Sequence, residues 1–321
     1  MTIQSLLSFS NIIGLIFATI TLSVVISLVI YLLKRMWRKK KSKLVWTPIS
    51  SVDRRSNLSY EEFVREYASV GKPAIITDAM KDWKASTKWT VDFFRSEYGS
   101  AVGQVLDCAT QTISAMTIGD YLDYMTLKER DKLLCLDRLL IRDYPELRED
   151  YKVPAYFPNL FERIPEKLRK KYKLEPGHLL IGHKNTSIGL HYDSHHENAW
   201  VALISGKKRI VLFSPDQQDF LYDGKVDAFN PDLERFPLYK NANPVECTLN
   251  QGEIIYIPPD WWHHVKNIED TITLQHNSID KWNSELVFQS FVEVNPSKGH
   301  LFPLILEFPW LGRTLFAIGL L

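Results

Sequence analysis

Cysteine is scarce in this chain, which has three cysteines, Cys108, Cys135 and Cys247, among 321 residues. They lie far apart, and no two form a Cys-x-x-Cys pair. This spacing argues against a disulfide framework and against a zinc site made of thiolates. A reducing compartment is therefore expected.

The chain also lacks an excess of either charge, because 39 basic side chains stand against 38 acidic ones. Nucleic-acid binding would therefore need a local basic patch. One basic run lies in residues 163–173 and contains Arg163, Lys167, Arg169, Lys170, Lys171 and Lys173. A solvated helix face is the ordinary explanation of such a run, and contact with RNA phosphate is the alternative.

One long segment has no charged residue at all. Residues 12–33 are uncharged over 22 positions, which predicts a transmembrane helix, since a span needs roughly 20 residues. A cleaved signal peptide is the alternative, but residues 1–11 carry no basic side chain and the apolar run is long for one. Seven Lys or Arg residues follow within 34–43, so the positive-inside rule predicts that the main domain faces the cytosol. The protein is therefore expected to be a single-pass membrane protein of the endoplasmic reticulum, outer mitochondrial or plasma membrane.

Residues 34–55 are expected to be a basic flank and linker, followed by a globular domain over about residues 56–282. Ser59-Tyr60-Glu61-Glu62 is a capping box that predicts a helix. Pro73–Ile76 predicts a strand, and Trp89–Phe94 the start of another helix. From Leu179 onward, short apolar runs alternate with Gly, Pro, Asn and Asp, which predicts a β-sandwich or barrel.

The end of the chain, residues 283–321, is expected to be an apolar helical tail. Glu307, Arg313 and two prolines argue against a second membrane span within 301–321. A helix that forms a homodimer, a helix that covers the core and an interfacial segment all stay open.

The sequence His191-Tyr192-Asp193 places an imidazole and a carboxylate two positions apart. Alternate residues of a strand project to one face, so both groups can reach one metal ion. A packed histidine and an aspartate that caps a turn are the ordinary alternatives.

A second segment, residues 252–264, reads Gly-Glu-Ile-Ile-Tyr-Ile-Pro-Pro-Asp-Trp-Trp-His-His and predicts a strand, a proline-shaped turn and then a histidine. Two histidines and one carboxylate form the facial triad of non-haem Fe(II) oxygenases, which leaves coordination positions for a co-substrate and O2.

Three further segments accompany these two: the residues from Trp89 onward, Gly-Lys-Lys-Arg-Ile-Val-Leu-Phe-Ser-Pro at 206–215, and Asn-Pro-Asp-Leu-Glu-Arg-Phe-Pro at 230–237. With them, the chain resembles the cupin-like JmjC hydroxylases, which include the asparaginyl hydroxylase that inhibits hypoxia-inducible factor and the tRNA-wybutosine hydroxylase. The resemblance implies a mainly β fold with flanking helices, the double-stranded β-helix or cupin jelly roll.

The resemblance also implies a site that uses Fe(II), O2 and 2-oxoglutarate as co-substrate. Its metal ligands and catalytic residues would be His191, Asp193 and His263, with His264 in a supporting role. Lys208 would bind the distal carboxylate of 2-oxoglutarate, since a lysine ammonium suits it, whereas Lys207 would point to solvent. Asn198 and Gln275 are the other expected co-substrate contacts.

The chain departs from the family at three positions. Ile188 stands where many relatives carry Thr or Ser, with Thr186 and Ser187 nearby, Leu134 or Cys135 stands where a tyrosine is frequent, and Gln275 stands roughly where an asparagine is common. The activity that the resemblance implies is hydroxylation of a protein side chain. Histone demethylation is less expected, because a membrane anchor would keep the enzyme from chromatin and no reader module is recognised in the sequence. Hydroxylation of RNA and a catalytically weakened cupin interaction module are the alternatives.

Overall fold

The structure is a computed structural model that describes residues 14, 18–29, 31–32, 43–127, 134–167, 169, 177–296 and 301–317. The chain divides into two compact units. The larger unit comprises Leu44–Asn159 and Glu175–Val287 and contains both sheets and the candidate site. The smaller unit comprises Met1–Lys43, Leu160–Leu174 and Phe288–Leu321.

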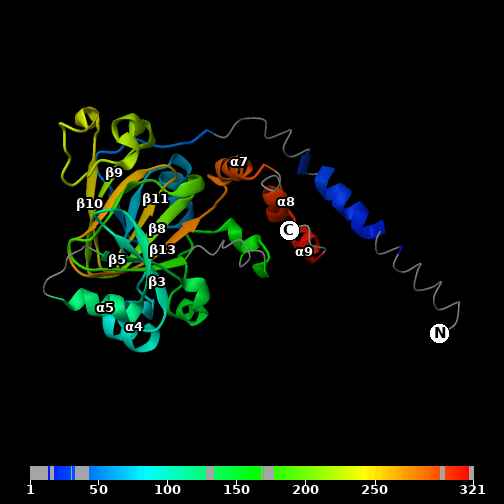
Figure 1. Ribbon diagram of the computed structural model, residues 1–321. Coiled ribbons are helices and arrows are strands. Elements are labelled where there is room, and N and C mark those ends of the chain that lie inside the picture. The colour runs from blue at the N-terminus through cyan, green and yellow to red at the C-terminus, as the bar shows by residue number, and fades with distance from the viewer. Residues whose placement is uncertain are drawn as a thin grey trace. The chain divides into compact units, whose positions relative to one another are not determined.

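Two sheets form the larger unit (Figure 1). The nine-stranded sheet has the order β1-β2-β11-β8-β13-β6-β5-β3-β4, and the four-stranded sheet has the order β10-β9-β12-β7. The strands are β1 Asp53–Arg55, β2 Ala74–Ile76, β3 Val102–Asp107, β4 Ile113–Thr117, β5 Leu134–Leu140, β6 Gly177–Gly182, β7 Ser187–His191, β8 Asn198–Ser205, β9 Lys207–Phe213, β10 Val245–Asn250, β11 Ile254–Ile257, β12 Trp262–Asn267 and β13 Thr271–Ser278. This is the mainly β, cupin-like jelly roll that the sequence predicts.

Helices flank the larger sheet: α2 Tyr60–Glu66, α3 Ala85–Lys88, α4 Val91–Tyr98 and α5 Ile118–Thr126. Figure 1 shows α4 and α5 at the end of the sheet that contains β3. The predicted capping box of α2 is present, with Ser59 accepting from the backbone of Glu62 and Glu62 accepting in return. The predicted strand at Pro73–Ile76 and the predicted helix start near Trp89 are confirmed as β2 and α4.

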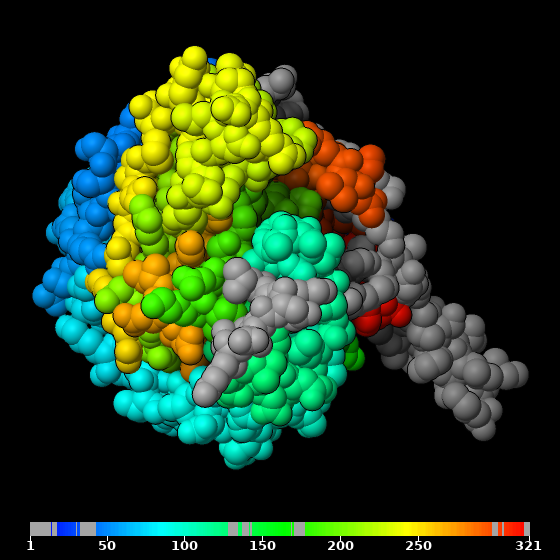
Figure 2. Space-filling model, turned by 60° about the vertical axis from the view of Figure 1, so that its left-hand side comes forward, coloured from blue at the N-terminus to red at the C-terminus, as the bar shows by residue number. Residues whose placement is uncertain are grey.

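Strand alternation divides the apolar residues of β9 between two cores. Ile210 and Leu212 pack between the sheets with residues such as Leu203 and Ile255. Val211 and Phe213 face the other way, against the segment 215–243 that crosses the outside of the smaller sheet. Figure 2 shows part of this segment in yellow along one edge of the molecule. The smaller sheet is therefore covered on both faces, and its inner face carries the candidate site.

Three further helices lie near the end of the chain, α7 Ser284–Val294, α8 Leu301–Glu307 and α9 Pro309–Ala317. The expected helical tail over 283–321 is thus helical through most of its described part. Dimerisation through this tail stays a prediction.

The described residues contradict the predicted transmembrane helix. Among them, no helix is long and apolar enough to cross a bilayer. The expectation of a single-pass membrane protein is corrected accordingly, and the predicted basic flank at 34–42 lies outside the described residues.

Candidate metal centre

The two histidines of the predicted triad meet through strand pairing. His191 ends β7, His263 lies in β12, and the antiparallel register places them opposite one another. Their ring centroids are 4.2 Å apart. A β-bulge between His263 and Val265 shifts the register just beyond this pair, a common way to aim a side chain at a site.

Asp193 follows β7 in an extended conformation, with φ −69° and ψ 142°. It precedes the 3-10 turn Ser194–His196, but its side chain makes no capping hydrogen bond there. The candidate ligand atoms of His191, Asp193 and His263 all lie within 4.8 Å of one another. This arrangement of two imidazoles and one carboxylate fits a single iron ion, and the reading of Asp193 as a turn cap is not supported.

Both imidazoles are held in the tautomer that a metal requires. His191 Nδ1 lies 2.8 Å from the Gly189 carbonyl oxygen, and His263 Nδ1 lies 3.0 Å from the Trp261 carbonyl oxygen. Since a carbonyl only accepts, each Nδ1 donates its hydrogen and each Nε2 keeps its lone pair for a metal. Burial, helped by the neighbouring His191, lowers the pKa of His263 to about 4, so this ring is neutral at pH 7.

His264 has the supporting role that the sequence predicts. It projects to the opposite face of β12, where its Nδ1 accepts the backbone N–H of Ala228 at 3.2 Å and its ring packs on Phe229 at 4.5 Å. Burial lowers the pKa of His264 to about 4, which keeps Nδ1 available as an acceptor. His264 thereby joins the segment 215–243 to the strand that carries His263.

Lys208 is buried near the start of β9, with its Nζ 2.7 Å from Asn267 Oδ1 on the adjacent strand. Asn267 in turn donates to Thr186 Oγ1 at 2.7 Å. Among the residues that the structure describes, Lys208 has no carboxylate within ion-pair distance. Burial lowers its pKa to about 8. Lys207, one position earlier, instead pairs with Glu269 at 3.3 Å and is 41% exposed, as alternation predicts.

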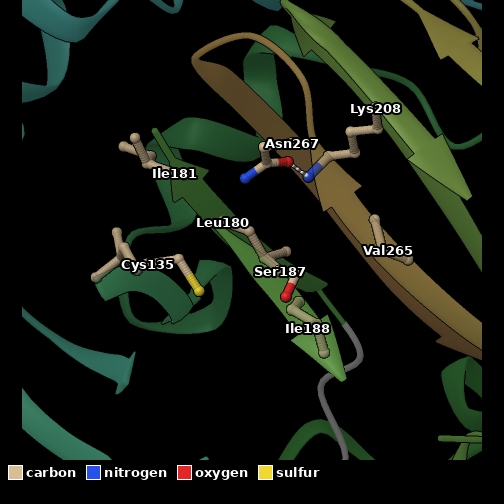
Figure 3. A pocket seen from close by; sticks show the side chains of 10 residues that line it. Cys135, Leu180, Ile181, Ser187, Ile188, Lys208, Val265 and Asn267 are labelled. Carbon is tan, nitrogen blue, oxygen red and sulfur yellow. Dashed lines mark hydrogen bonds between the residues drawn. The ribbon is translucent and has the colours of Figure 1, made fainter. Parts of the chain in front are cut away.

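A cavity opens beside the Lys208 ammonium (Figure 3). Its lining joins the two sheets and consists of Cys135, Leu136, Leu180, Ile181, Gly182, Ser187, Ile188, Lys208, Val265 and Asn267. Among the positions that depart from the family pattern, Ile188 and Cys135 line this cavity, whereas Leu134 and Gln275 are not among its lining residues. The Thr186 hydroxyl is held by Asn267 and the His183 carbonyl, whereas Ser187 brings a hydroxyl to the wall.

The structure does not bring Asn198 or Gln275 to this wall. The Asn198 amide is occupied on both sides, since its oxygen accepts from Tyr256 Oη at 3.0 Å and its nitrogen donates to Asp280 at 3.1 Å. Gln275 Nε2 is 3.4 Å from Asn277 Oδ1, and Asn277 donates to Glu197 at 3.0 Å. The roles of Asn198 and Gln275 in binding the co-substrate stay predictions.

Sequence reasoning missed two features of the site. Asn267 lies four residues after His263 on the same face of β12, so strand alternation could have found it. The second is a contact between His196 Nδ1 and both carboxylate oxygens of Asp260, at 2.8 and 2.7 Å. Nothing in the sequence pairs these two residues, which lie in separate loops.

The two-sheet jelly roll and its His-Asp-His centre together define a cupin of the JmjC type. In agreement, the profile of the cupin-like domain family matches residues 60–278, which is more than half of the chain, and the chain belongs to this family. The narrower resemblance to the asparaginyl and tRNA-wybutosine hydroxylases stays a prediction.

Several curated proteins are similar to this chain. Lysine-specific demethylase JMJ21 of Arabidopsis thaliana is 32% identical over 79% of the chain and 28% of its own length. The 2-oxoglutarate and iron-dependent oxygenase JMJD4 of Gallus gallus is 26% identical over 75% of the chain and 62% of its own length. The bifunctional arginine demethylase and lysyl-hydroxylase psr-1 of Caenorhabditis elegans is 29% identical over 75% and 64%. The chain thus spans less than two thirds of the length of each of these relatives.

Proposed function

We propose that this protein is an Fe(II)- and 2-oxoglutarate-dependent oxygenase that hydroxylates a protein side chain. The observation that carries the proposal is the triad of His191, Asp193 and His263, with both imidazoles held in the ligand tautomer. The names of two relatives support it, since one is a 2-oxoglutarate and iron-dependent oxygenase and the other includes a lysyl-hydroxylase.

Lys208 suits the distal carboxylate of 2-oxoglutarate because it is a buried cation. Burial removes water from the ammonium and destabilises its charge, and a carboxylate of the co-substrate would compensate for this loss. In the paired strands β9 and β12, Lys208 stands opposite Asn267 and Leu212 opposite His263. Four strand residues, or about 13 Å along the strands, therefore separate the Lys208–Asn267 pair from the Leu212–His263 pair. The Lys208 side chain and a five-carbon dicarboxylate together would bridge that gap.

Bound iron would couple the oxidative decarboxylation of 2-oxoglutarate by O2, giving succinate and CO2, to oxidation of a substrate C–H bond. The chain supplies the binding and the environment. Lys208 and Asn267 hold the carboxylate, and Ile188 and Val265 give the cavity apolar walls. Tyr192 lies between His191 and Asp193, is 43% exposed and packs on Trp262, so its ring is available to a substrate at the surface.

One of the two sequence-based grounds against demethylation was the membrane anchor, and this ground is withdrawn with it. Oxidation of an N-methyl group begins with the same C–H hydroxylation, and several relatives are named demethylases. We propose hydroxylation of a protein side chain. Loss of a methyl group from a substrate would instead identify the protein as a demethylase. Hydroxylation of RNA stays a prediction, since Lys170, Lys171 and Lys173 lie outside the described residues.

Succinate production tests the proposal. Protein reconstituted with Fe(II) without oxygen and then exposed to O2 and 2-oxoglutarate should release succinate, and peptide substrates found by screening should gain one oxygen atom. Asp193→Ala and Lys208→Ala should lose this turnover, whereas Lys207→Ala should keep it. Equal turnover in the wild type and Asp193→Ala would contradict the proposal, and iron binding without succinate would favour the weakened interaction module.

A further inference from the structure

Two cysteines that are distant in sequence meet at the wall of the Lys208 cavity. Cys135 lies on β5, and Cys108 lies directly after β3, the strand that pairs with β5. Their sulfur atoms are 3.9 Å apart, with Cys135 buried and Cys108 partly exposed. Cys247 lies on β10 in the other sheet and provides an internal comparison.

One cysteine lines the proposed co-substrate site, and the other contacts a residue that lines it. Cys135 lines the cavity, and Figure 3 shows its side chain together with those of Ser187, Lys208 and Asn267. The Cys108 sulfur accepts the backbone N–H of Ser187 at 3.4 Å. Ser187 also lines the cavity and begins β7, the strand that ends at His191. The thiol pair therefore contacts both the cavity wall and the strand that ends at the metal ligand His191.

We propose that Cys108 and Cys135 are a redox modification site, at which a hydroperoxide forms a reversible disulfide that weakens 2-oxoglutarate binding. The effect on 2-oxoglutarate rests on the proposed function, whereas the disulfide does not. A disulfide has an S–S distance of about 2.05 Å, so the two sulfurs must approach by about 1.9 Å in total, a movement on the scale of side-chain rotation.

The chemistry balances with hydrogen peroxide as the oxidant. The more exposed Cys108, as thiolate, attacks one peroxide oxygen, which breaks the O–O bond and leaves a sulfenic acid and, after protonation, one water. The Cys135 thiol then attacks this sulfur, the S–S bond forms and a second water leaves. In total, two thiols are oxidised and one peroxide is reduced to two waters.

The disulfide would change the cavity in two ways. It would draw the Cys135 sulfur from its place in the wall, and it would remove the Cys108 sulfur from the Ser187 N–H. Ser187 also brings a hydroxyl to the cavity wall, which Ile188 lines without one. The expected result is a several-fold loss of 2-oxoglutarate affinity in the oxidised protein.

The disulfide is tested on the full chain, freed of metal and fully reduced, then treated with a small excess of hydrogen peroxide. Alkylation and trypsin digestion should give a linked pair of peptides, 96–128 and 133–138, that dithiothreitol separates. Cys247 should escape oxidation and be recovered in its alkylated form, because burial raises the pKa of its thiol to about 12 and leaves little reactive thiolate. Independent sulfinic acids without a cross-link, or oxidation of Cys247 at the same rate, would overturn the proposal.

The effect on binding is tested after the peroxide has been removed and Mn(II) added in place of iron. Oxidation should weaken 2-oxoglutarate binding in the wild type, and dithiothreitol should restore it. Cys108→Ser and Cys135→Ser should bind 2-oxoglutarate equally before and after peroxide. A cross-linked protein with unchanged affinity would refute the regulatory part. Failure of the reduced protein to bind 2-oxoglutarate at all would instead count against the proposed function.

Discussion

His263 and His264 are adjacent and both buried, yet strand alternation gives them different tasks. We predict that His263→Ala loses most of its iron affinity, because it removes one of three ligands. His264→Ala should keep iron but lower the free energy of unfolding by about 1–3 kcal/mol, because the Ala228 N–H loses its buried acceptor. Iron titration and urea unfolding of both variants check this. Equal iron loss in the two would show that the face assignment of β12 is wrong.

The ammonium of Lys208 makes co-substrate binding sensitive to pH. Since burial lowers its pKa to about 8, the side chain is charged below that pH and becomes neutral above it. The affinity for 2-oxoglutarate should therefore be highest below about pH 8. Above that pH the neutral lysine must take up a proton when 2-oxoglutarate binds, so the affinity should fall by up to about tenfold per pH unit. Calorimetric titrations from pH 6.5 to 9.5 measure the trend.

Lys208→Ala is the control for this dependence. It should bind more weakly, by about 10- to 150-fold for a lost charge-assisted bond of about 1.5–3 kcal/mol. Its remaining binding should also lack the fall above pH 8. A wild-type affinity that rises with pH would contradict the assignment of Lys208 as the carboxylate partner.

At the scale of elements, the segment 215–243 approaches β7 so closely that only glycine fits at one point. Gly224 has φ +79°, and a Cβ there would lie 2.1 Å from the Leu190 carbonyl oxygen. Gly252 has a similar φ of +85° but open space around it. Gly252→Ala should therefore cost about 1–2 kcal/mol of unfolding free energy for the left-handed backbone alone. Gly224→Ala should cost clearly more, and equal costs in urea unfolding would refute the close contact.

Two loops carry Asp193 and lead into His263, and the His196–Asp260 contact joins them. His196 and Asp260 both have positive φ, 56° and 61°, conformations that persist when surrounding contacts hold them. Asp260→Asn tolerates this backbone but removes the charge, so iron affinity should fall by about fivefold for roughly 1 kcal/mol. The matched control is Asp223→Asn, also at positive φ with 53° and in another segment, which should not change iron affinity. The same loss in both variants would exclude the positioning role.

Local signals in the sequence were sufficient for several elements and insufficient for others. The capping box at Ser59 and the opposite directions of Lys207 and Lys208 depend on neighbouring residues, and both were correctly predicted. The side chain of Asn198, in contrast, is committed to Tyr256 and Asp280, which are 58 and 82 positions away. Such partners are fixed by sheet order, which a single sequence does not encode locally.

At the scale of the whole molecule, the prediction of the β domain was correct and the prediction of the N-terminal membrane span was not. The jelly roll and its triad were predicted through the resemblance of several sequence segments to the cupin-like JmjC hydroxylases, whereas the apolar runs alone predicted a β-sandwich or barrel. The membrane span at 12–33 was inferred from apolar length alone, and the described helices do not support it. The sequence predicted that Lys208 binds the co-substrate, but it did not predict which residues line the cavity beside it. Three of them, Cys135, Ser187 and Asn267, come from three strands of two sheets.

His191 and His263 are 72 positions apart and meet only through the β7–β12 pairing at one edge of the smaller sheet. Pairing so distant is slow, because the chain loses the entropy of closing a long loop before the contact stabilises it. The metal centre is therefore absent from any partly folded chain that lacks this pairing. Iron that binds only the native state adds about 2.7 kcal/mol of stability at a free concentration one hundred times its Kd. Cellular iron would thus govern how many copies of the protein survive proteolysis, in addition to how fast each copy works.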